Sequence, residues 1–202
     1  MFMALKREGA VFLLGIMALA VVIALLFLSH VGEEEFAHLA VRFFGLYGFL
    51  FLSVATLITP FLKEVTQAFG RPFLKVHHAF SILGVVFITL HPVFNAIERL
   101  NLSVFVPRFD SWDLFWRLAG RPAFILLYIA LLAAILRTKA PKYWRPFHAL
   151  MYVALLFGIV HANLIGDDFE NLGIMIIFNV LFLASIASFA LKRYRTYLMK
   201  RK

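Results

Sequence analysis

Long apolar runs recur along the chain, separated by short segments that carry most of its charges. A bilayer core is about 30 Å thick and an α-helix rises about 1.5 Å per residue, so about 20 apolar residues suffice to cross it. The hydrophobic pattern therefore predicts six membrane-spanning helices. Their expected positions are residues 10–29, 43–62, 76–95, 122–136, 146–165 and 172–191.

The expected fold is an all-α, integral membrane six-helix bundle that forms a single domain over residues 1–202. Six spans use most of this length, so we expect no separate soluble domain. Hydrophobic residues make up 63% of the chain and the mean hydropathy is +0.90, whereas a soluble domain is about half apolar. The absence of cysteine excludes disulfides, cysteine-ligated iron–sulfur clusters and covalently attached c-type haem.

The charged residues predict how the six spans are oriented. With a cytoplasmic N-terminus, the cytoplasmic segments carry fifteen of the twenty Lys and Arg residues, and nine of the eleven acidic residues lie outside. This distribution obeys the positive-inside rule. We therefore expect a multi-pass protein of the cell inner (plasma) membrane with both termini in the cytoplasm. The same distribution accounts for the net charge of +9 without a nucleic-acid partner, because the basic residues flank spans.

The third and fifth expected spans each carry a histidine near both ends. His77 and His91 are fourteen residues apart, which places them about 21 Å apart along a helix and within about 40° of one face. His148 and His161 are thirteen residues apart, with about 19.5 Å of rise, but lie about 140° out of phase on an ideal helix. The fifth span therefore needs a local change of winding, for which Gly158 is a candidate, or rings that approach differently at the two levels.

These histidines predict a haem protein. An intramembrane histidine is costly and usually functional, and imidazole is a common ligand of haem iron. In the expected topology the two spans are parallel, so depth pairs His77 with His148 near the cytoplasmic face and His91 with His161 near the opposite face. We expect two stacked b-type haems between the third and fifth helices, with irons roughly 20 Å apart. His78 is an alternative to His77, because it lies thirteen residues from His91.

Basic residues near each face are candidate donors to the anionic haem propionates. At the cytoplasmic face the candidates are Arg71, Lys75 and Arg145. At the outer face the candidates are Arg121, Arg99, Arg108 and Arg117. Four arginines on the side that should be poor in them indicate either the outer propionates or an acidic partner.

Other polar and aromatic residues carry weaker signals. His30 and His38 flank the acidic run Glu33–Glu35, and we expect solvated loop histidines in preference to a metal-capture site. The long loop after the third span contains FDSWDLFWRL, which is typical of an interfacial segment and could cap the outer haem. Phe87 and Phe157 are candidates to pack between the haems.

Several of these motifs resemble the ferric reductase-like transmembrane domain family, which includes ferric reductases, NADPH oxidases and MsrQ-type (YedZ) haem-binding subunits of methionine sulfoxide reductase systems. The resemblance rests on His77 and His91–Pro92 in the third span and on His148 and His161 in the fifth. The segments ATLITPFLK, GRPAF and WRPFHALMYVALLFGIVH add to it, and the size and six-helix plan are closest to the MsrQ type. It favours His77 over His78.

The resemblance implies transmembrane electron transfer through two bis-histidine haems. The chain would be the haem-binding membrane subunit of an oxidoreductase, with no catalytic residue of its own. A cytoplasmic flavoprotein or quinol would be the donor, with FMN, FAD or quinone supplied by a partner or bound at the inner face. An extracytoplasmic protein, a metal ion or oxygen would be the acceptor. MsrQ-type chains commonly carry a basic residue where this chain has His77, and we expect no flavin domain of the kind that the larger reductases carry.

A haem-free small transporter or proton channel is the alternative function. Histidines at several depths can form a proton relay through a bilayer. Bound haem would decide between the two functions.

Overall fold

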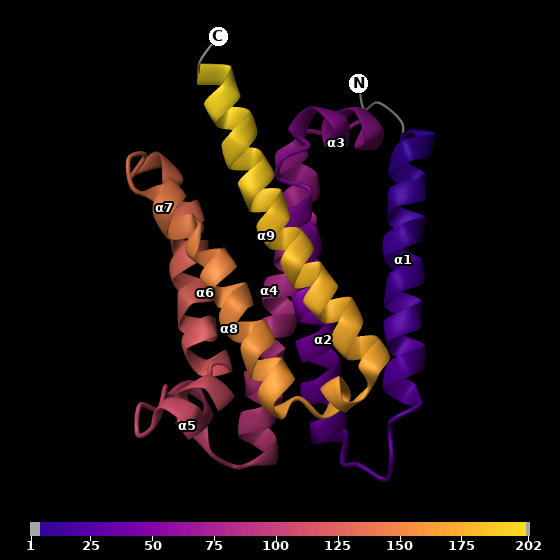
Figure 1. Ribbon diagram of the computed structural model, residues 1–202, viewed down its shortest axis with the longest axis vertical. Helices are drawn as coiled ribbons and strands as arrows, with labels where there is room; N and C mark the ends of the chain where they lie inside the picture. Colours follow the sequence, from indigo (N-terminus) through magenta and orange to yellow (C-terminus); the bar gives the residue numbers. More distant parts are fainter. Residues whose placement is uncertain (1–4, 201–202) are drawn as a thin grey trace.

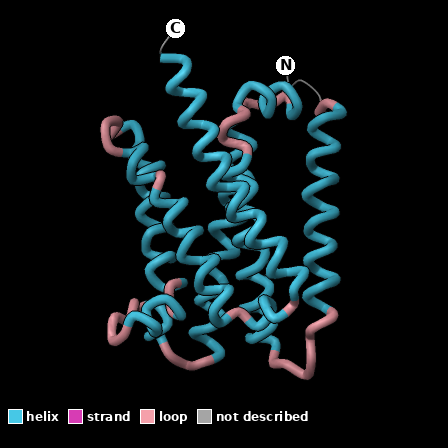
Figure 2. Tube along the Cα trace, in the orientation of Figure 1, coloured by secondary structure: helices cyan, strands magenta, loops and turns pink. Residues whose placement is uncertain are grey.

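The computed structural model describes residues 5–200, and it is entirely helical apart from turns and loops within that range (Figures 1 and 2). The helices, in chain order, are α1 (Arg7–Leu28), α2 (Phe36–Leu57), α3 (Leu62–Phe69), α4 (Phe73–Glu98), α5 (Trp112–Arg117), α6 (Gly120–Ile135), α7 (Trp144–His148), α8 (Leu150–Ile165) and α9 (Leu172–Lys200). Three short 3₁₀ turns complete the described chain: η1 (Leu102–Phe105), η2 (Leu136–Thr138) and η3 (Asp167–Glu170).

Within residues 5–200, six helical segments are long and apolar enough to cross a membrane, as the hydrophobic pattern predicts. The second span differs from its expected position, because α2 begins at Phe36 instead of residue 43. The fifth span consists of α7 followed directly by α8. The start of α1 and the end of α9 lie at one end of the bundle together with α3 and α7, which we call the terminal end (Figure 1). The opposite end, with α5 and the 3₁₀ turns η1 and η3, is the loop end.

The central helix of the bundle is α2, which packs along α4 and also touches α8 and α9. Two glycines allow α2 and α4 to approach closely. A Cβ atom on Gly48 would meet the Ile88 side chain at 2.7 Å, and one on Gly84 would meet Leu52 at 2.7 Å. Small residues at helix contacts are a common means of close packing in membranes. This tight pair fixes one wall of the space in which the site lies.

The opposite wall is formed by α6 and α8, which pack against each other and are joined by α7. The short helix α5 lies over the loop end of α8, where the Trp116 and Phe115 rings make edge contacts with Phe157 at 5.4 and 5.9 Å. The interfacial segment expected from the sequence therefore packs onto the bundle through its aromatic face. The outermost helix is α1, which stands beside α3 and α9 (Figure 1).

Candidate functional site: two facing histidine pairs

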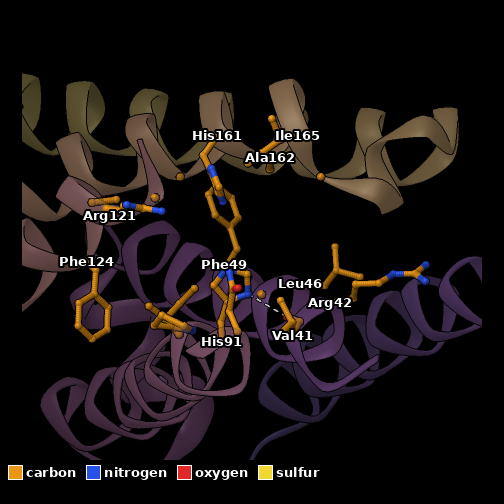
Figure 3. A pocket seen from close by; sticks show the side chains of 18 of the residues that line it. Val41, Arg42, Leu46, Phe49, His91, Arg121, Phe124, His161, Ala162 and Ile165 are labelled. Atoms are coloured by element: carbon orange, nitrogen blue, oxygen red, sulfur yellow. Dashed lines mark hydrogen bonds between the residues drawn. The ribbon is translucent and has the colours of Figure 1, made fainter. Parts of the chain in front are cut away.

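Two pairs of histidine rings face each other between the two walls, one pair near each end of the bundle. The His77 and His148 rings have centroids 6.4 Å apart and planes at 80°. The His91 and His161 rings have centroids 6.4 Å apart and planes at 78°. In Figure 3, His91 and His161 approach each other from facing helices. The structure thus brings together the four predicted ligands, in the predicted pairs.

Each of the four rings is oriented by a hydrogen bond from its Nδ1 atom to a backbone carbonyl. On the α4 side, His77 donates to Ala55 at 3.0 Å and His91 donates to Val41 at 2.8 Å, both acceptors being in α2. On the α8 side, His148 donates to Ala130 at 3.0 Å and His161 donates to Arg117 at 2.7 Å. A proton held at Nδ1 leaves Nε2 as the lone-pair atom that a metal requires. All four histidines are therefore held in one tautomer.

The phase problem of the fifth span is solved by a break in the helix at Ala149. The helix α7 ends at His148, α8 begins at Leu150, and Ala149 has φ −68° and ψ −14°. The Tyr152 amide donates to the Ala149 carbonyl at 3.1 Å. This hydrogen bond joins residues three apart, as in a 3₁₀-helix, and not four apart as in an α-helix. Gly158, one candidate for this change, lies within the continuous helix α8, so the change of winding is elsewhere.

Two glycines allow the histidine pair at the loop end, His91 and His161, to pack against the neighbouring helices. A Cβ atom on Gly45 of α2 would lie 2.9 Å from Nδ1 of His91. A Cβ atom on Gly120, the first residue of α6, would lie 2.9 Å from Cδ2 and 3.1 Å from Nε2 of His161. All three distances are shorter than ordinary van der Waals contact, so any larger residue would push the ring away. The GRPAF motif therefore contributes its glycine to the site.

A cavity of about 430 Å³ surrounds the loop-end pair and is lined by residues of α2, α4, α6 and α8. Its volume lies within the range of about 300–1,000 Å³ that small-molecule sites occupy. Apolar side chains such as Leu52, Leu127 and the buried ring of Phe49 line its interior. Charged and polar side chains gather in its lining toward the loop end: His38, Arg42, Glu98, Arg99, Arg121, Asp167 and Asp168.

At the terminal end, His77 and not His78 faces His148. The His78 ring lies 6.1 Å from the His77 ring and is exposed. The Phe73 ring stacks on His77 at 5.5 Å with an 18° angle between the planes. The Ser81 hydroxyl lies 3.4 Å from Nε2 of His77, a weak contact that leaves this nitrogen available to a stronger partner.

The predicted propionate donors lie at the two ends of the site. Arg121 lines the cavity, and its Nη1 donates to the carbonyls of Ser103 and Val106, both at 2.9 Å. Its guanidinium retains other N–H groups for an anion. At the terminal end, Arg71, Lys75 and Arg145 are exposed and lie within a few residues of the His77/His148 pair in the chain.

Two further observations refine this set of basic residues. Arg108 forms an exposed ion pair with Asp110 at 2.9 Å, and this hydrogen bond and charge hold the pKa of the Asp110 carboxyl below its usual value. Arg108 is thereby engaged away from the cavity. Lys192 of α9 lies close enough to His77 and Arg145 to interact with both electrostatically. Lys192 could not be recognised as a site residue from the sequence, because only the fold brings α9 to this place.

The expectation that His38 is a solvated loop histidine is wrong. His38 lies in the first turn of α2, is 33% exposed, and has a carboxylate at each ring nitrogen. His30, in contrast, is exposed beside Ser29 and Asn171, as expected. Among residues 5–200, no group of three or more His, Cys, Asp or Glu side chains is arranged to hold a metal ion.

A buried ion-pair cluster beside His38 was also missed. Arg42 of α2 is 7% exposed and binds Asp168 of η3 through two nitrogens, at 2.7 and 3.3 Å. Its other terminal nitrogen donates to Glu34, and its guanidinium lies 5.0 Å from the centre of the Phe27 ring. Arg42 therefore ties α1, α2 and η3 together at the loop end.

The two phenylalanines named as candidates to pack between the haems contact other aromatic rings. Phe87 packs against Phe43, Phe44 and Phe51 of α2, and Phe157 packs against α5. Neither ring lines the cavity. Phe49 is one of the phenylalanines that do line the cavity, and its ring lies 3.6 Å from the place of a Cβ atom on Gly158. The others are Phe105, Phe124, Phe169 and Phe178.

Comparison with known protein families gives a match. The family model described as "Ferric reductase like transmembrane component" matches residues 44–159, which is more than half of the chain. The matched segment contains His77, His91 and His148, and His161 lies two residues beyond it. No curated protein and no solved structure matches the chain.

Proposed function

Because the chain belongs to the ferric reductase-like transmembrane family, we propose that it carries electrons across a membrane through two b-type haems. The ligands are His77 with His148 and His91 with His161. The observation that carries this proposal is the repeated geometry of the two pairs, each with ring centroids 6.4 Å apart. Two pairs with the same separation favour a shared ligand geometry over incidental packing.

This separation fits an iron atom between the rings. A metal–nitrogen bond to imidazole is about 2.0–2.1 Å, and the ring centre lies about 1.1 Å behind Nε2, so two rings on one iron have centroids about 6.3 Å apart. The four Nδ1 hydrogen bonds hold each Nε2 free for that role. The cavity around His91 and His161 supplies the apolar space that a non-covalent porphyrin needs.

The residues of the chain would bind, orient and insulate the haems. A bis-histidine haem supplies outer-sphere electron transfer, since its iron has no open position for a substrate. The carbonyl acceptors in α2 and α6 fix the ring orientations, and the side chains of α2 and α8 exclude water between the two levels. Arg121 at the loop end, with Arg71, Lys75 and Arg145 at the terminal end, would neutralise the propionates.

We propose that electrons enter from a donor at the terminal end and leave to an acceptor at the loop end. The terminal end would face the cytoplasm and receive electrons from a flavoprotein or quinol, with FMN, FAD or quinone bound there or supplied by the partner. Exposed Lys192, Arg193 and Arg195 near the end of α9 support this, because a basic surface attracts an acidic flavoprotein and anionic lipids. An extracytoplasmic protein, a metal ion or oxygen would accept electrons at the loop end.

The histidine relay is less consistent with the geometry. A relay passes a proton from one titratable group or water to the next. Here each Nδ1 proton is donated to a backbone carbonyl, which does not titrate in the physiological range. This geometry supports ligation of a metal by the four rings over a chain of proton carriers.

The experiment that tests the proposal is electron transfer across a sealed membrane. Purified protein is reconstituted in liposomes that contain trapped ferricyanide, and dithionite is added outside. We expect reduction of the trapped acceptor, and loss of this reduction in His91→Ala, whereas His30→Ala should behave as the wild type. Liposomes of wild-type protein that transfer electrons no faster than empty liposomes would refute the proposed function.

A further inference from the structure

The side chain of His38 joins three separate elements at the loop end. It lies in the first turn of α2, and its Nδ1 is 2.9 Å from Oε1 of Glu98 at the end of α4. Its Nε2 is 3.1 Å from Oδ2 of Asp167 in η3. Both ring nitrogens therefore face carboxylate oxygens, in contrast to the four paired histidines, whose Nδ1 atoms face carbonyls.

These two hydrogen bonds require one proton more than a neutral imidazole and two ionised carboxylates hold. A neutral imidazole has one N–H and one lone pair, and an ionised carboxylate can only accept hydrogen bonds. Both hydrogen bonds can exist only when His38 is an imidazolium or when one of the carboxyls is protonated. The cluster of His38, Glu98 and Asp167 is therefore a place where the fold holds a proton.

The other charged groups around His38 do not supply this proton. From the segment before α2, Oε2 of Glu34 lies 3.7 Å from Nε2 of His38 and is buried without a hydrogen-bond partner. From α2 itself, the Arg42 charge is engaged by Glu34 and Asp168. The cluster thus keeps an excess of negative charge, which favours the bound proton.

The cluster lies in the wall of the cavity that contains the loop-end histidine pair. His38, Glu98 and Asp167 all line that cavity. His38 is also three residues before Val41, whose carbonyl accepts the His91 hydrogen bond, so the two lie on adjacent turns of one face of α2. Asp167 is 61% exposed, which gives the proton a direct route to water at the loop end.

We propose that this cluster is a redox-linked proton site. It binds a proton from the aqueous phase at the loop end when the His91/His161 site gains an electron, and it releases that proton when the electron leaves. The inference rests on the proposed function, because the electron must reside in the site. Proton uptake balances the added negative charge, and this makes an electron less costly to hold in a medium of low dielectric constant.

The size of the effect follows from Coulomb's law. Two unit charges roughly 12 Å apart, at an effective dielectric constant of about 20, change each other's binding equilibrium about tenfold. A tenfold change in proton affinity between the oxidised and reduced states corresponds to a 59 mV change of potential for one electron. The midpoint potential of the loop-end haem should therefore fall by about this amount in total as the pH rises through the range in which the cluster titrates.

The test is a spectropotentiometric titration of the purified holoprotein between pH 5 and pH 9. His38→Gln keeps a polar side chain but removes the titrating ring, and it should abolish most of the fall in potential with pH. The matched control is His30→Gln, since His30 lies at the same end without a carboxylate at its ring, and it should behave as the wild type. Glu98→Gln removes one negative charge and should shift the pH-dependent range to lower pH.

The possible results separate this inference from the proposed function. If both haems are present and the potentials of the wild type and His38→Gln vary with pH in the same way, the proton site is refuted and the electron-transfer function stands. Should His38→Gln fail to fold, an unshifted pH range in Glu98→Gln refutes the site equally. A wild-type protein without haem would overturn the proposed function and the proton site together.

Discussion

The contact between α2 and the His91 ring predicts a strong effect of a very small substitution. Gly45→Ala adds one methyl group on the face of α2 that His91 touches. That carbon would lie 2.9 Å from Nδ1 and 3.3 Å from Cε1 of the ring. The helix backbone cannot retreat without losing its packing on α4, so the His91 ring must move by a few tenths of an ångström.

The cost of this movement can be worked out from the interactions that it disturbs. Weakening the 2.8 Å bond from His91 to the Val41 carbonyl costs about 0.5–1.5 kcal/mol. Forcing the side chain away from its preferred rotamer costs about 0.5–1.5 kcal/mol more. The sum of about 1–3 kcal/mol corresponds to a haem affinity at this site roughly 5- to 150-fold weaker. Alanine in a helix is about 0.8–1.0 kcal/mol better than glycine, but this gain belongs to folding and not to haem binding.

The assay is the transfer of haem from the detergent-solubilised protein to excess apomyoglobin, followed by absorbance. We expect Gly45→Ala to lose one haem faster than the wild type and to retain the other at the wild-type rate. Gly15→Ala in α1 is the matched control, because its added carbon meets no atom within 4 Å beyond its chain neighbours and the adjacent backbone of its own helix. Wild-type retention of both haems in Gly45→Ala would contradict the position that we assign to His91.

Two further predictions concern the loop end. Gly120→Ala places a carbon 3.1 Å from Nε2 of His161, the proposed ligating atom, so it should deplete the same haem as Gly45→Ala and more severely, measured by haem content after purification. Arg42→Met leaves the Asp168 carboxylate, 4% exposed, without its cation, and should lower the free energy of unfolding by about 3–5 kcal/mol in a denaturant titration. The double variant with Asp168→Leu should recover much of that loss, and no recovery would show that the ion pair is not the cause.

The sequence was sufficient for the features that depend on local periodicity. The number of spans follows from the length of each apolar run, and the confirmed family follows from the motifs around His77, His91 and His148. The facing of His77 by His148 follows from depth in two parallel helices, because the bilayer thickness fixes how residues of different spans can meet.

Other features depend on contacts between distant segments and were not predictable from local patterns. The sequence predicts a loop at His38 because a polar run precedes it and obscures where α2 begins. Its partners Glu98 and Asp167 lie 60 and 129 residues away in the chain. The break at Ala149 carries no glycine or proline of its own, so the sequence pointed to Gly158 instead. Lys192 approaches His77 only because α9 crosses the bundle.

The haem content of the purified chain tests the central claim most directly. The pyridine haemochrome of the wild-type protein should give two b-type haems per chain. His77→Ala and His148→Ala should each lose the same haem, recognised by its midpoint potential, and His91→Ala and His161→Ala should each lose the other. A chain that binds one haem or none, or variants in which His77 and His91 affect the same haem, would contradict the two facing pairs as the path of the electron.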